Sequence, residues 1–377
     1  MIEKLESWLL NSIRVKEGEN CGAMYGWKNI HAPNEAAKYP FIYNEIVGYS
    51  LSIFSFLYSE TKKNDYLLAI GDSLGYIKRN ITTKNLLNTG KIIDTNFTQK
   101  GDMEKQIYSF DNGMIIAGLI NYYKISKSQE VYDLILRMVN SLIKYFFKEH
   151  KLRYALLDNN LRITNYGLEK WSSKIGSFHA KVGIGFTDLY KITGNCEYLK
   201  ISYGLCELAM DLQEPDGSFL NNENNRDCIF LHPHLYACEG LTYIGSSLSD
   251  NKLLNSGLRG IEWAISTITE TGGVPRNNRQ SLDQADCTSQ LLRLLLLYRD
   301  NLVSFSKLLS EKVEQCIEIL YERIKSFFIQ SEGGVRYDDC SEFACTWCNM
   351  FSTQALILLA KRKKNQYMNT DRLEFFV

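Results

Sequence analysis

The sequence lacks an excess of charge of either sign, because 43 lysines and arginines are balanced by 43 aspartates and glutamates. The basic residues form no long run, so nothing indicates the electropositive surface of a nucleic-acid-binding protein. No apolar run approaches the roughly 20 residues that a membrane-spanning helix needs. We therefore expect a soluble protein with no nucleic-acid partner and no membrane span, and a polar, uncharged substrate fits this balance of charge.

A secretory signal is also lacking. Residues 1–15 place charged side chains around a short apolar stripe, which indicates an amphipathic helix. Ten cysteines without such a signal are typical of reduced thiols in a cytoplasmic protein. Cys340, Cys345 and Cys348 include one C-x-x-C pair but not the second pair of a structural zinc site. We expect no cofactor, and metal binding by this cluster is left open.

One short pattern recurs about every 65 residues, which is typical of a repeat architecture. It reads Tyr58-Ser-Glu-Thr61, Tyr123-Lys-Ile-Ser126 and Tyr190-Lys-Ile-Thr193, and a second tyrosine follows each copy. Every copy ends an apolar, glycine-containing run and precedes an amphipathic one. The chain is therefore predicted to be an array of helical hairpins.

Apolar periodicity near 3.6 residues predicts the helices of this array. Their expected ranges are 2–14, 44–58, 63–80, 112–125, 129–148, 178–192, 196–212, 234–248, 251–268, 286–299, 306–328 and 350–363. From the second range on, every other helix is apolar on nearly all faces, as buried helices are, and the rest have a polar face. We predict an all-α (α/α)6 toroid formed by residues 1–377 as a single domain, with the N-terminal helix closing the outer ring.

The predicted connections are unequal in length. Turns from inner to outer helices are short, whereas the segments that lead into inner helices are long. Three long segments contain the turn signals Asp216-Gly217, Gly272-Gly273 and Gly333-Gly334. We expect short β-hairpins in the loops on one face of the toroid, and the functional mouth at that face.

Six helical hairpins with small residues in the inner ring, these turns and polar residues at inner-helix starts resemble the six-hairpin glycosidase-like superfamily. That group includes unsaturated glucuronyl hydrolases, α-mannanases, toroidal polysaccharide lyases and, by fold, N-acylglucosamine 2-epimerases. The resemblance implies a carbohydrate substrate but not one reaction. Segments 177–181, 212–217 and 231–239 also look like toroid proteins of bacterial surface-polysaccharide gene clusters, which implies a role in polysaccharide biosynthesis.

A second toroid group offers an alternative. The segment from Gly272 to Cys287 resembles the GG turn and Asp/Cys helix start of protein prenyltransferase β subunits, where Asp, Cys and a later His hold zinc. The corresponding last repeat, Phe343 to Trp347, contains no histidine, and the DxDD signature of terpene cyclases is absent. Isoprenoid chemistry therefore remains only an alternative.

Three carboxylates are candidates for acid/base chemistry. By resemblance to the aromatic-Asp entries of toroid glycosidases, Asp111 is a candidate acid or base, although Asp is also a favoured helix cap. Glu239 and Glu45 each lie near the start of an inner helix, where burial would raise the pKa as a general acid requires. The alternative is pairing with Lys181 or Arg276. Hydrolysis needs two carboxylates across the scissile bond.

Histidine is scarce, and three of the five copies fall at predicted inner-helix starts: His179, His232 and His234. A neutral imidazole can take or give a proton beside a carbonyl, as epimerisation or elimination requires. The alternatives are that they cap helices, bond loop carbonyls or, for His232 and His234, form a metal pair.

Further residues are expected to contact substrate. Lys181 and Arg276 can bind a carboxylate or phosphate, or pair internally. Asp286 and Gln290 share one helical face and can bind hydroxyl groups. Aromatic side chains can pack on the CH faces of sugars. The expected substrate-binding set is Glu45, Tyr108, Lys181, His232, Tyr236, Arg276, Asp286, Gln290 and Trp347.

The leading hypothesis is a glycoside hydrolase that acts on an oligo- or polysaccharide by paired-carboxylate chemistry. Asp111 and Glu239 would be its acid and base, and His179 and His234 would assist as catalytic proton-transfer groups. A His-based sugar epimerase or polysaccharide lyase is the first alternative. An isoprenoid enzyme or a non-catalytic glycan-binding scaffold is the second. The sequence leaves the sugar and the oligomeric state open.

Overall fold

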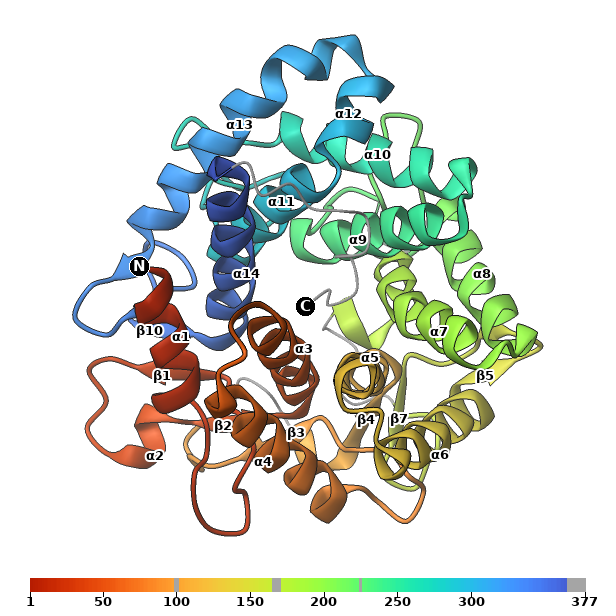
Figure 1. The fold of residues 1–377 in the computed structure, drawn as a ribbon, viewed down its shortest axis with the longest axis vertical. Coiled ribbons are helices and arrows are strands. Elements are labelled where there is room, and N and C mark those ends of the chain that lie inside the picture. The colour runs from red at the N-terminus through yellow and green to blue at the C-terminus, as the bar shows by residue number, and fades with distance from the viewer. Residues whose placement is uncertain (98–101, 165–170, 224–225, 365–377) are drawn as a thin grey trace.

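The computed structural model describes residues 1–97, 102–164, 171–223 and 226–364, drawn in Figure 1. Its helices are α1 (Ile2–Asn11), α2 (Glu35–Lys38), α3 (Asn44–Thr61), α4 (Asn64–Asn80), α5 (Ser109–Ser126), α6 (Gln129–Phe146), α7 (Ala180–Thr193), α8 (Cys196–Asp211), α9 (Leu231–Leu248), α10 (Asn251–Ser266), α11 (Ala285–Leu297), α12 (Arg299–Phe305), α13 (Lys307–Ser326) and α14 (Thr346–Lys363). Three 3-10 turns are η1 (Met103–Lys105), η2 (Trp171–Ser173) and η3 (Ser177–His179).

These helices form two concentric rings (Figure 1). In the inner ring α3, α5, α7, α9, α11 and α14 each contact the next helix, and α14 contacts α3 to close the ring. The outer helices α4, α6, α8, α10 and α13 each pack on the inner helix that precedes them, and α1 packs on α14. The predicted (α/α)6 toroid is confirmed, and each predicted helix is present. Among the α-helices of the described residues, the short α2 and α12 were not predicted.

The repeated tyrosine pattern builds the turns between inner and outer helices. The N–H groups of Lys62, Lys127 and Gly194 donate to the carbonyls of the pattern's tyrosines four residues earlier, and all three residues are left-handed (φ 58°, 52° and 72°). The last hydroxyl of each copy then accepts the N–H group two residues further on. This bond lies at the start of the next helix, so one short pattern both ends the inner helix and begins the outer one.

Close packing of the inner ring depends on glycine. A Cβ atom on Gly118 would lie 2.2 Å from the carbonyl oxygen of Gly48, and one on Gly48 would lie 2.6 Å from the backbone of Ile115. The two glycines therefore let α3 and α5 approach backbone to backbone.

The strands lie in the long loops and pair only in twos. They are β1 (Trp27–Asn29), β2 (Phe41–Tyr43), β3 (Gly90–Ile92), β4 (Gln106–Tyr108), β5 (Phe147–Lys148), β6 (Lys151–Leu152), β7 (Leu156–Asp158), β8 (Phe328–Ile329), β9 (Gly334–Val335) and β10 (Phe343–Cys345). The antiparallel pairs are β1–β10, β2–β3, β4–β7, β5–β6 and β8–β9. Because β2, β4 and β10 run directly into α3, α5 and α14, the strand pairs gather at the end of the toroid where inner helices begin.

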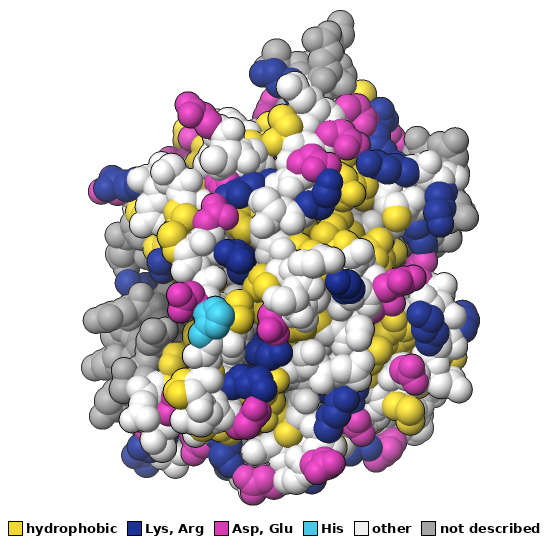
Figure 2. Space-filling view, turned by 90° about the vertical axis from the view of Figure 1, so that its left-hand side faces the viewer, with side chains coloured by type: hydrophobic (Ala, Val, Ile, Leu, Met, Phe, Trp, Pro, Cys, Tyr) yellow, Lys and Arg dark blue, Asp and Glu magenta, His cyan; other side chains and the backbone are white. Residues whose placement is uncertain are grey.

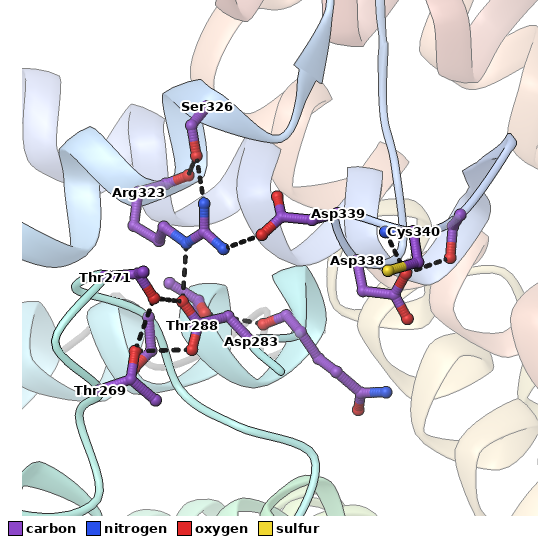
Figure 3. Close-up of polar contacts among 12 residues, drawn as sticks. Thr269, Thr271, Asp283, Thr288, Arg323, Ser326, Asp338, Asp339 and Cys340 are labelled. Carbon is purple, nitrogen blue, oxygen red and sulfur yellow. Dashed lines mark hydrogen bonds and ion pairs between the residues drawn. The ribbon is translucent and has the colours of Figure 1, made fainter. Parts of the chain in front are cut away.

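The loop before α11 is anchored by a buried carboxylate (Figure 3). Asp283 accepts hydrogen bonds from Thr269 Oγ1 (2.7 Å), Thr271 Oγ1 (2.6 Å) and Arg323 Nε (2.7 Å). Arg323 also donates to Asp339 at 2.5 Å. These contacts join the fifth loop to α13 and to the sixth loop, and so hold the start of α11 in place.

The described helices include none that is long and apolar enough to cross a membrane. On the flank seen in Figure 2, basic and acidic side chains are intermixed, as expected from the even charge balance.

Candidate functional site

A cavity of ≈ 530 Å³ opens at the end of the toroid where the long loops gather. This volume falls in the range of roughly 300–1,000 Å³ that is typical of small-ligand sites. The lining comes from the starts of inner helices and from the loops that precede them, as the loop lengths predict. Seven of the residues expected at the site line it: Glu45, Tyr108, His232, Tyr236, Arg276, Asp286 and Trp347.

Below the cavity, the lumen of the toroid is built in layers. A helix turns about 100° per residue, so positions i, i+4 and i+7 lie on one face and descend along the axis. On α9 these positions are His232, Tyr236 and Glu239. On α11 they are Asp286, Gln290 and Arg293, and on α14 they are Trp347, Phe351 and Gln354. The first residue of each series lines the cavity, and on α9 the second residue, Tyr236, lines it as well. The remaining residues of the three series are buried beneath the cavity.

The cavity floor brings an imidazole next to a carboxylate. His232 Nδ1 lies 3.4 Å from Asp286 Oδ2, and Trp347 Nε1 donates to the same oxygen at 2.9 Å. Burial lowers the pKa of His232, and the negative charge of Asp286 opposes that shift without cancelling it. The imidazole is therefore neutral near pH 7. Its side chain keeps 16% of its surface exposed, so it can exchange a proton with a molecule in the cavity.

Glu45 reaches the cavity from the first turn of α3 and is 7% exposed. Beneath it, Tyr49 donates a hydrogen bond to Tyr236 (2.7 Å). Burial raises the pKa of both phenols well above the ordinary value, and the charge of Glu45 raises them further. Both therefore remain protonated, and they link Glu45 to the α9 side of the lumen through hydroxyl groups.

The deepest layer is a buried cluster of three charges. Glu239 pairs with Lys181 (2.7 Å) and with Arg293, and all three side chains are 3% exposed or less. Burial lowers the pKa of Lys181 to about 8, although Glu239 opposes the shift. Burial pushes the pKa of Glu239 upward, but the charges of Arg293 and Lys181 outweigh it and hold the pKa below its ordinary value.

One wall of the cavity is aromatic. Trp27 stacks on Phe343 with ring centroids 4.6 Å apart, and it meets Trp347 edge-on at 6.5 Å. The ring centroid of Tyr337 lies 6.0 Å from that of Phe343. The β1–β10 pair aligns Trp27 with Cys345, next to the start of α14, so the N-terminal segment and the sixth hairpin build this wall together.

The wall formed by the loops before α7, α9 and α11 combines polar side chains with the rings of Trp171 and Phe230. Its lining includes Lys174, Asn221, Asn222 and Arg276. Asn221 exchanges two hydrogen bonds with the backbone of Phe230 (2.8 and 3.2 Å), which fixes this wall to the start of α9. The cavity therefore has one wall suited to the apolar face of a ring and another suited to its polar substituents.

Among the described residues, one group of three side chains could hold a metal ion. Ligand atoms of His232, Asp286 and Cys287 lie within 4.8 Å of one another. Burial raises the pKa of the Cys287 thiol well above its ordinary value, so this sulfur is protonated, and a protonated thiol is a poor ligand. Within the described residues, Cys340, Cys345 and Cys348 do not form such a group.

No family model and no curated protein matches the sequence. Solved structures do match over nearly the whole chain. A sugar epimerase from a ruminal bacterium has a TM-score of 0.72 and 16% identity, covering 95% of this chain and 98% of the other. Cellobiose 2-epimerase from Bacillus thermoamylovorans B4167 has a TM-score of 0.73 and 14% identity, covering 94% and 98%.

A third match is the GH76A α-1,6-mannanase from Salegentibacter sp. HEL1_6, with a TM-score of 0.67 and 13% identity, covering 95% of this chain and 98% of the mannanase. The fold is that of the six-hairpin toroids. At identities this low the likeness shows the fold alone, and the resemblance of architecture inferred from the sequence is confirmed.

Two histidines expected to act as catalytic proton carriers lie outside the cavity. His179 is buried between Ser109 Oγ (3.1 Å) and the carbonyl of Gly176 (3.1 Å), and burial lowers its pKa to about 3. His234 Nδ1 accepts the N–H of Phe219 (3.0 Å) while Nε2 donates to the carbonyl of Gly260 (3.0 Å). Of the three histidines expected at the site, only His232 reaches the cavity, because His179 and His234 join loops to helices.

Four other expected site residues also lie behind the lining. Glu239, Lys181 and Gln290 belong to the buried layers, where Gln290 Nε2 donates to Glu239 Oε1 at 3.4 Å. The expected raised pKa of Glu239 is wrong, because two cations flank its carboxylate. Asp111 is 1% exposed and accepts the hydroxyl of Thr89 (2.9 Å), a lining residue, so it supports the cavity from behind.

The sequence contains further signals for two residues of the site. Arg293 is a lone cation inside the apolar run Leu291 to Leu297, which is a sign of a buried ion pair. Tyr49 lies one helical turn after Glu45 and shares its face. Trp27 had no such local signal, because only the β1–β10 pairing brings it to the cavity.

Proposed function

We propose that this protein is a carbohydrate-active enzyme, a glycoside hydrolase in which Glu45 and Asp286 are the catalytic carboxylates. One observation carries the proposal: these two carboxylates stand in the lining of a cavity that has an aromatic wall and a polar wall. Hydrolysis needs one carboxyl group to protonate the leaving oxygen and another to assist attack at the sugar carbon. Their positions on α3 and α11 supply the two groups from different sides of the lumen.

The roles of the two groups follow from their surroundings. Asp286 accepts hydrogen bonds from Trp347 Nε1 (2.9 Å) and from the N–H of Cys287 (2.8 Å), and both stabilise its charged form. Asp286 is thus the base or nucleophile. Glu45, the second carboxylate of the cavity lining, takes the remaining role of the acid. His232 contacts Asp286 and binds or orients the substrate.

The test is release of reducing ends from pools of plant and bacterial oligosaccharides. Glu45→Gln and Asp286→Asn should each lower kcat/KM by about 10²- to 10⁴-fold, as loss of an acid or base does. Glu19→Gln is the control, because Glu19 is an exposed partner of Lys91 and does not line the cavity. Turnover that persists in both cavity variants would rule out this assignment.

A sugar epimerase or isomerase is the second candidate. The contact between neutral His232 and Asp286 favours it, because such a pair can move a proton on a carbon next to a carbonyl. Several of the matching structures are sugar epimerases or isomerases. Reaction in D2O separates the candidates. Epimerisation places deuterium on a sugar carbon and fails in His232→Asn, whereas hydrolysis yields new reducing ends without deuterium at carbon.

Product analysis distinguishes the hydrolase from a lyase, a scaffold and an isoprenoid enzyme. A polysaccharide lyase would create an unsaturated product that absorbs in the ultraviolet, and a non-catalytic scaffold would bind glycans without turnover. An isoprenoid enzyme would contain stoichiometric zinc, for which His232, Asp286 and Cys287 are the candidate ligands. Metal analysis of the purified protein tests for that zinc directly.

We place the enzyme in the cytoplasm and in surface-polysaccharide biosynthesis. Buried thiols such as Cys206, Cys238 and Cys287 support a reducing compartment. The resemblance of segments 177–181, 212–217 and 231–239 to toroid proteins of surface-polysaccharide gene clusters supports the pathway. Loss of a surface glycan in cells that lack the protein, restored by wild type but not by Glu45→Gln, would test the pathway, and cell fractionation would test the compartment.

A further inference from the structure

The polar wall of the cavity carries two cations. Arg276 and Lys174 both line the cavity. Among the residues that the structure describes, neither forms an ion pair. By contrast, Arg279 in the same loop pairs with the carboxylate of Asp227 (3.8 Å), and its Nε donates to the backbone carbonyl of Asp227 (2.6 Å).

Arg276 is held in place by its backbone. Its carbonyl accepts the N–H of Leu231 (3.0 Å), and its own N–H donates to Leu282 (3.2 Å). Its guanidinium lies 5.6 Å from the ring centroid of Phe230. Further along the loop, Asp283 is bonded to Arg323, as Figure 3 shows. The backbone that carries this charge is thus fixed relative to the start of α9 before any ligand binds, which lowers the cost of binding.

The negative and positive side chains of the cavity lining lie at different depths. The carboxylates Glu45 and Asp286 are 7% and 1% exposed, so they lie on the floor. Arg276 is exposed and Lys174 is half-buried, so these cations lie nearer the opening. An anionic group would be repelled by the floor and attracted to the polar wall, which sets one orientation for a charged substrate.

We infer that the substrate is an acidic sugar, whose anionic group binds Arg276 and Lys174 while its ring packs on the aromatic wall. This inference rests on the proposed function and names its substrate class. Guanidinium groups bind carboxylates, sulfates and phosphates through paired N–H donors, so a uronic acid and a sulfated sugar share the required chemistry. The even charge of the whole chain favoured an uncharged substrate, but recognition depends on the charges at the cavity.

The test compares matched ligands on the full-length protein. A panel of neutral disaccharides is titrated beside the same disaccharides oxidised to uronic acids at C6, and beside their 6-sulfates, at low ionic strength. The uronates should bind about tenfold more tightly than their neutral counterparts, as a charge-assisted hydrogen bond implies. Added salt should reduce the difference, because the charges lie near solvent. Sulfates that bind as tightly would identify a general anionic group, and weaker sulfates would identify a carboxylate.

Variants assign the preference to the polar wall. Arg276→Gln should bring the ratio of acidic to neutral affinity close to one, and Lys174→Gln should reduce it. Arg279→Gln is the matched control, since it removes an exposed arginine from the same loop but not from the cavity lining, and it should keep the wild-type ratio. Melting temperatures should stay near that of wild type, because both arginines are exposed.

Equal binding of neutral and acidic sugars by the wild type would overturn the inference. The inference would also fail if Arg276→Gln kept the wild-type ratio of acidic to neutral affinity. It would fail too if Arg279→Gln lowered that ratio as much as Arg276→Gln does. If neutral sugars are processed in a manner that depends on Glu45 and Asp286 while acidic ones are not preferred, the inference fails and the proposed function stands. If no sugar of either kind binds, both fail.

Discussion

His232 and His234 are two residues apart on α9 and point in opposite directions. Two residues turn a helix by about 200°, so only one of the pair can face the lumen. His232 shares its face with Tyr236 and Glu239, at i+4 and i+7, and His234 faces α10 through Gly260. The sequence placed both histidines near a helix start, but the predicted helix began at residue 234. With His232 outside the predicted helix, the opposite facing of the two side chains could not be predicted. The helix begins at Leu231.

The structural role of His234 leads to a prediction about stability. His234→Ala should leave the buried N–H of Phe219 without a partner and remove the second hydrogen bond that the carbonyl of Gly260 accepts. A buried group without a partner costs about 1–3 kcal/mol, so the free energy of unfolding should fall by about that amount. Urea unfolding measures the change. The control is His150→Ala, because His150 forms an exposed pair with Glu197 and should cost less than about 1 kcal/mol.

The buried charge cluster gives a second prediction at this scale. Glu239→Gln would leave Lys181 and Arg293 as two buried cations, and breaking a buried pair costs about 3–5 kcal/mol. Lys181→Met would instead leave Glu239 and Arg293 as a balanced pair, so it should cost less. The double variant Glu239→Gln/Lys181→Met should be more stable than Glu239→Gln alone, and urea unfolding measures the difference. A loss of activity in Glu239→Gln without loss of stability would instead return Glu239 to a catalytic role.

The chemistry of individual residues was predictable only in part. Glu45, His232, Asp286 and Trp347 reach the cavity, because polar and aromatic residues at inner-helix starts meet at one end of a toroid. Whether such a residue lines the cavity or lies behind it depends on helix register and on the loop above it. His179 is covered by its own loop through Gly176, which no local pattern reveals.

At the scale of the element, the turns from inner to outer helices are the clearest product of the sequence. Gly194 takes a left-handed conformation, and a Cβ atom there would meet nothing within 4 Å. Gly194→Ala should therefore cost about 1 kcal/mol through backbone strain alone. Lys127 has the same conformation with a side chain (φ 52°), so Lys127→Gly should be neutral or stabilising by up to about 1 kcal/mol. Urea unfolding of both variants tests the pair, and the expected result is a loss of stability in Gly194→Ala with no loss in Lys127→Gly.

Helix ranges were predictable because burial dominates this fold. The inner helices are apolar on nearly all faces, and the outer helices are amphipathic, so periodicity alone separates the two rings. The ends were less predictable. The helix expected over 286–299 stops at Leu297, and α12 turns away from it at Tyr298, where no glycine or proline marks a break. Segment 177–181 begins as a 3-10 turn before α7.

At the scale of the whole molecule, the lumen is a product of ring closure. Tyr49 and Tyr236 meet at 2.7 Å although 187 positions separate them, and Arg293 bonds Gln354 from the next inner helix at 2.9 Å. Helical patterns predict each helix separately, but which layers meet across the ring depends on the axial shift of every inner helix. That shift is set by contacts such as those of Gly48 and Gly118, and no single segment encodes it.

Ring closure also ties the aromatic wall to the N-terminus. Trp8 on α1 is 2% exposed, and its indole nitrogen would lie 2.9 Å from a Cβ atom on Gly334 in β9. Because α1 contacts α14, α4 and β9, it seals the junction between the first and sixth hairpins. Trp8→Ala should cost about 3–5 kcal/mol and open that junction first. Amide hydrogen exchange should then accelerate in β9, β10 and α14, and the cavity should bind sugars more weakly because Trp347 and Phe343 lose their support.

The control for this prediction removes a similar contact away from the junction. Leu205 on α8 is fully buried in the outer ring, and Leu205→Ala should cost about 2–5 kcal/mol. Its faster exchange should centre on α7 and α8, which pack together, and leave the aromatic wall protected. Identical exchange patterns in both variants would show that the ring opens only as a whole. We expect a single unfolding transition in urea for both variants, because residues 1–377 are predicted to be one domain whose core continues from hairpin to hairpin.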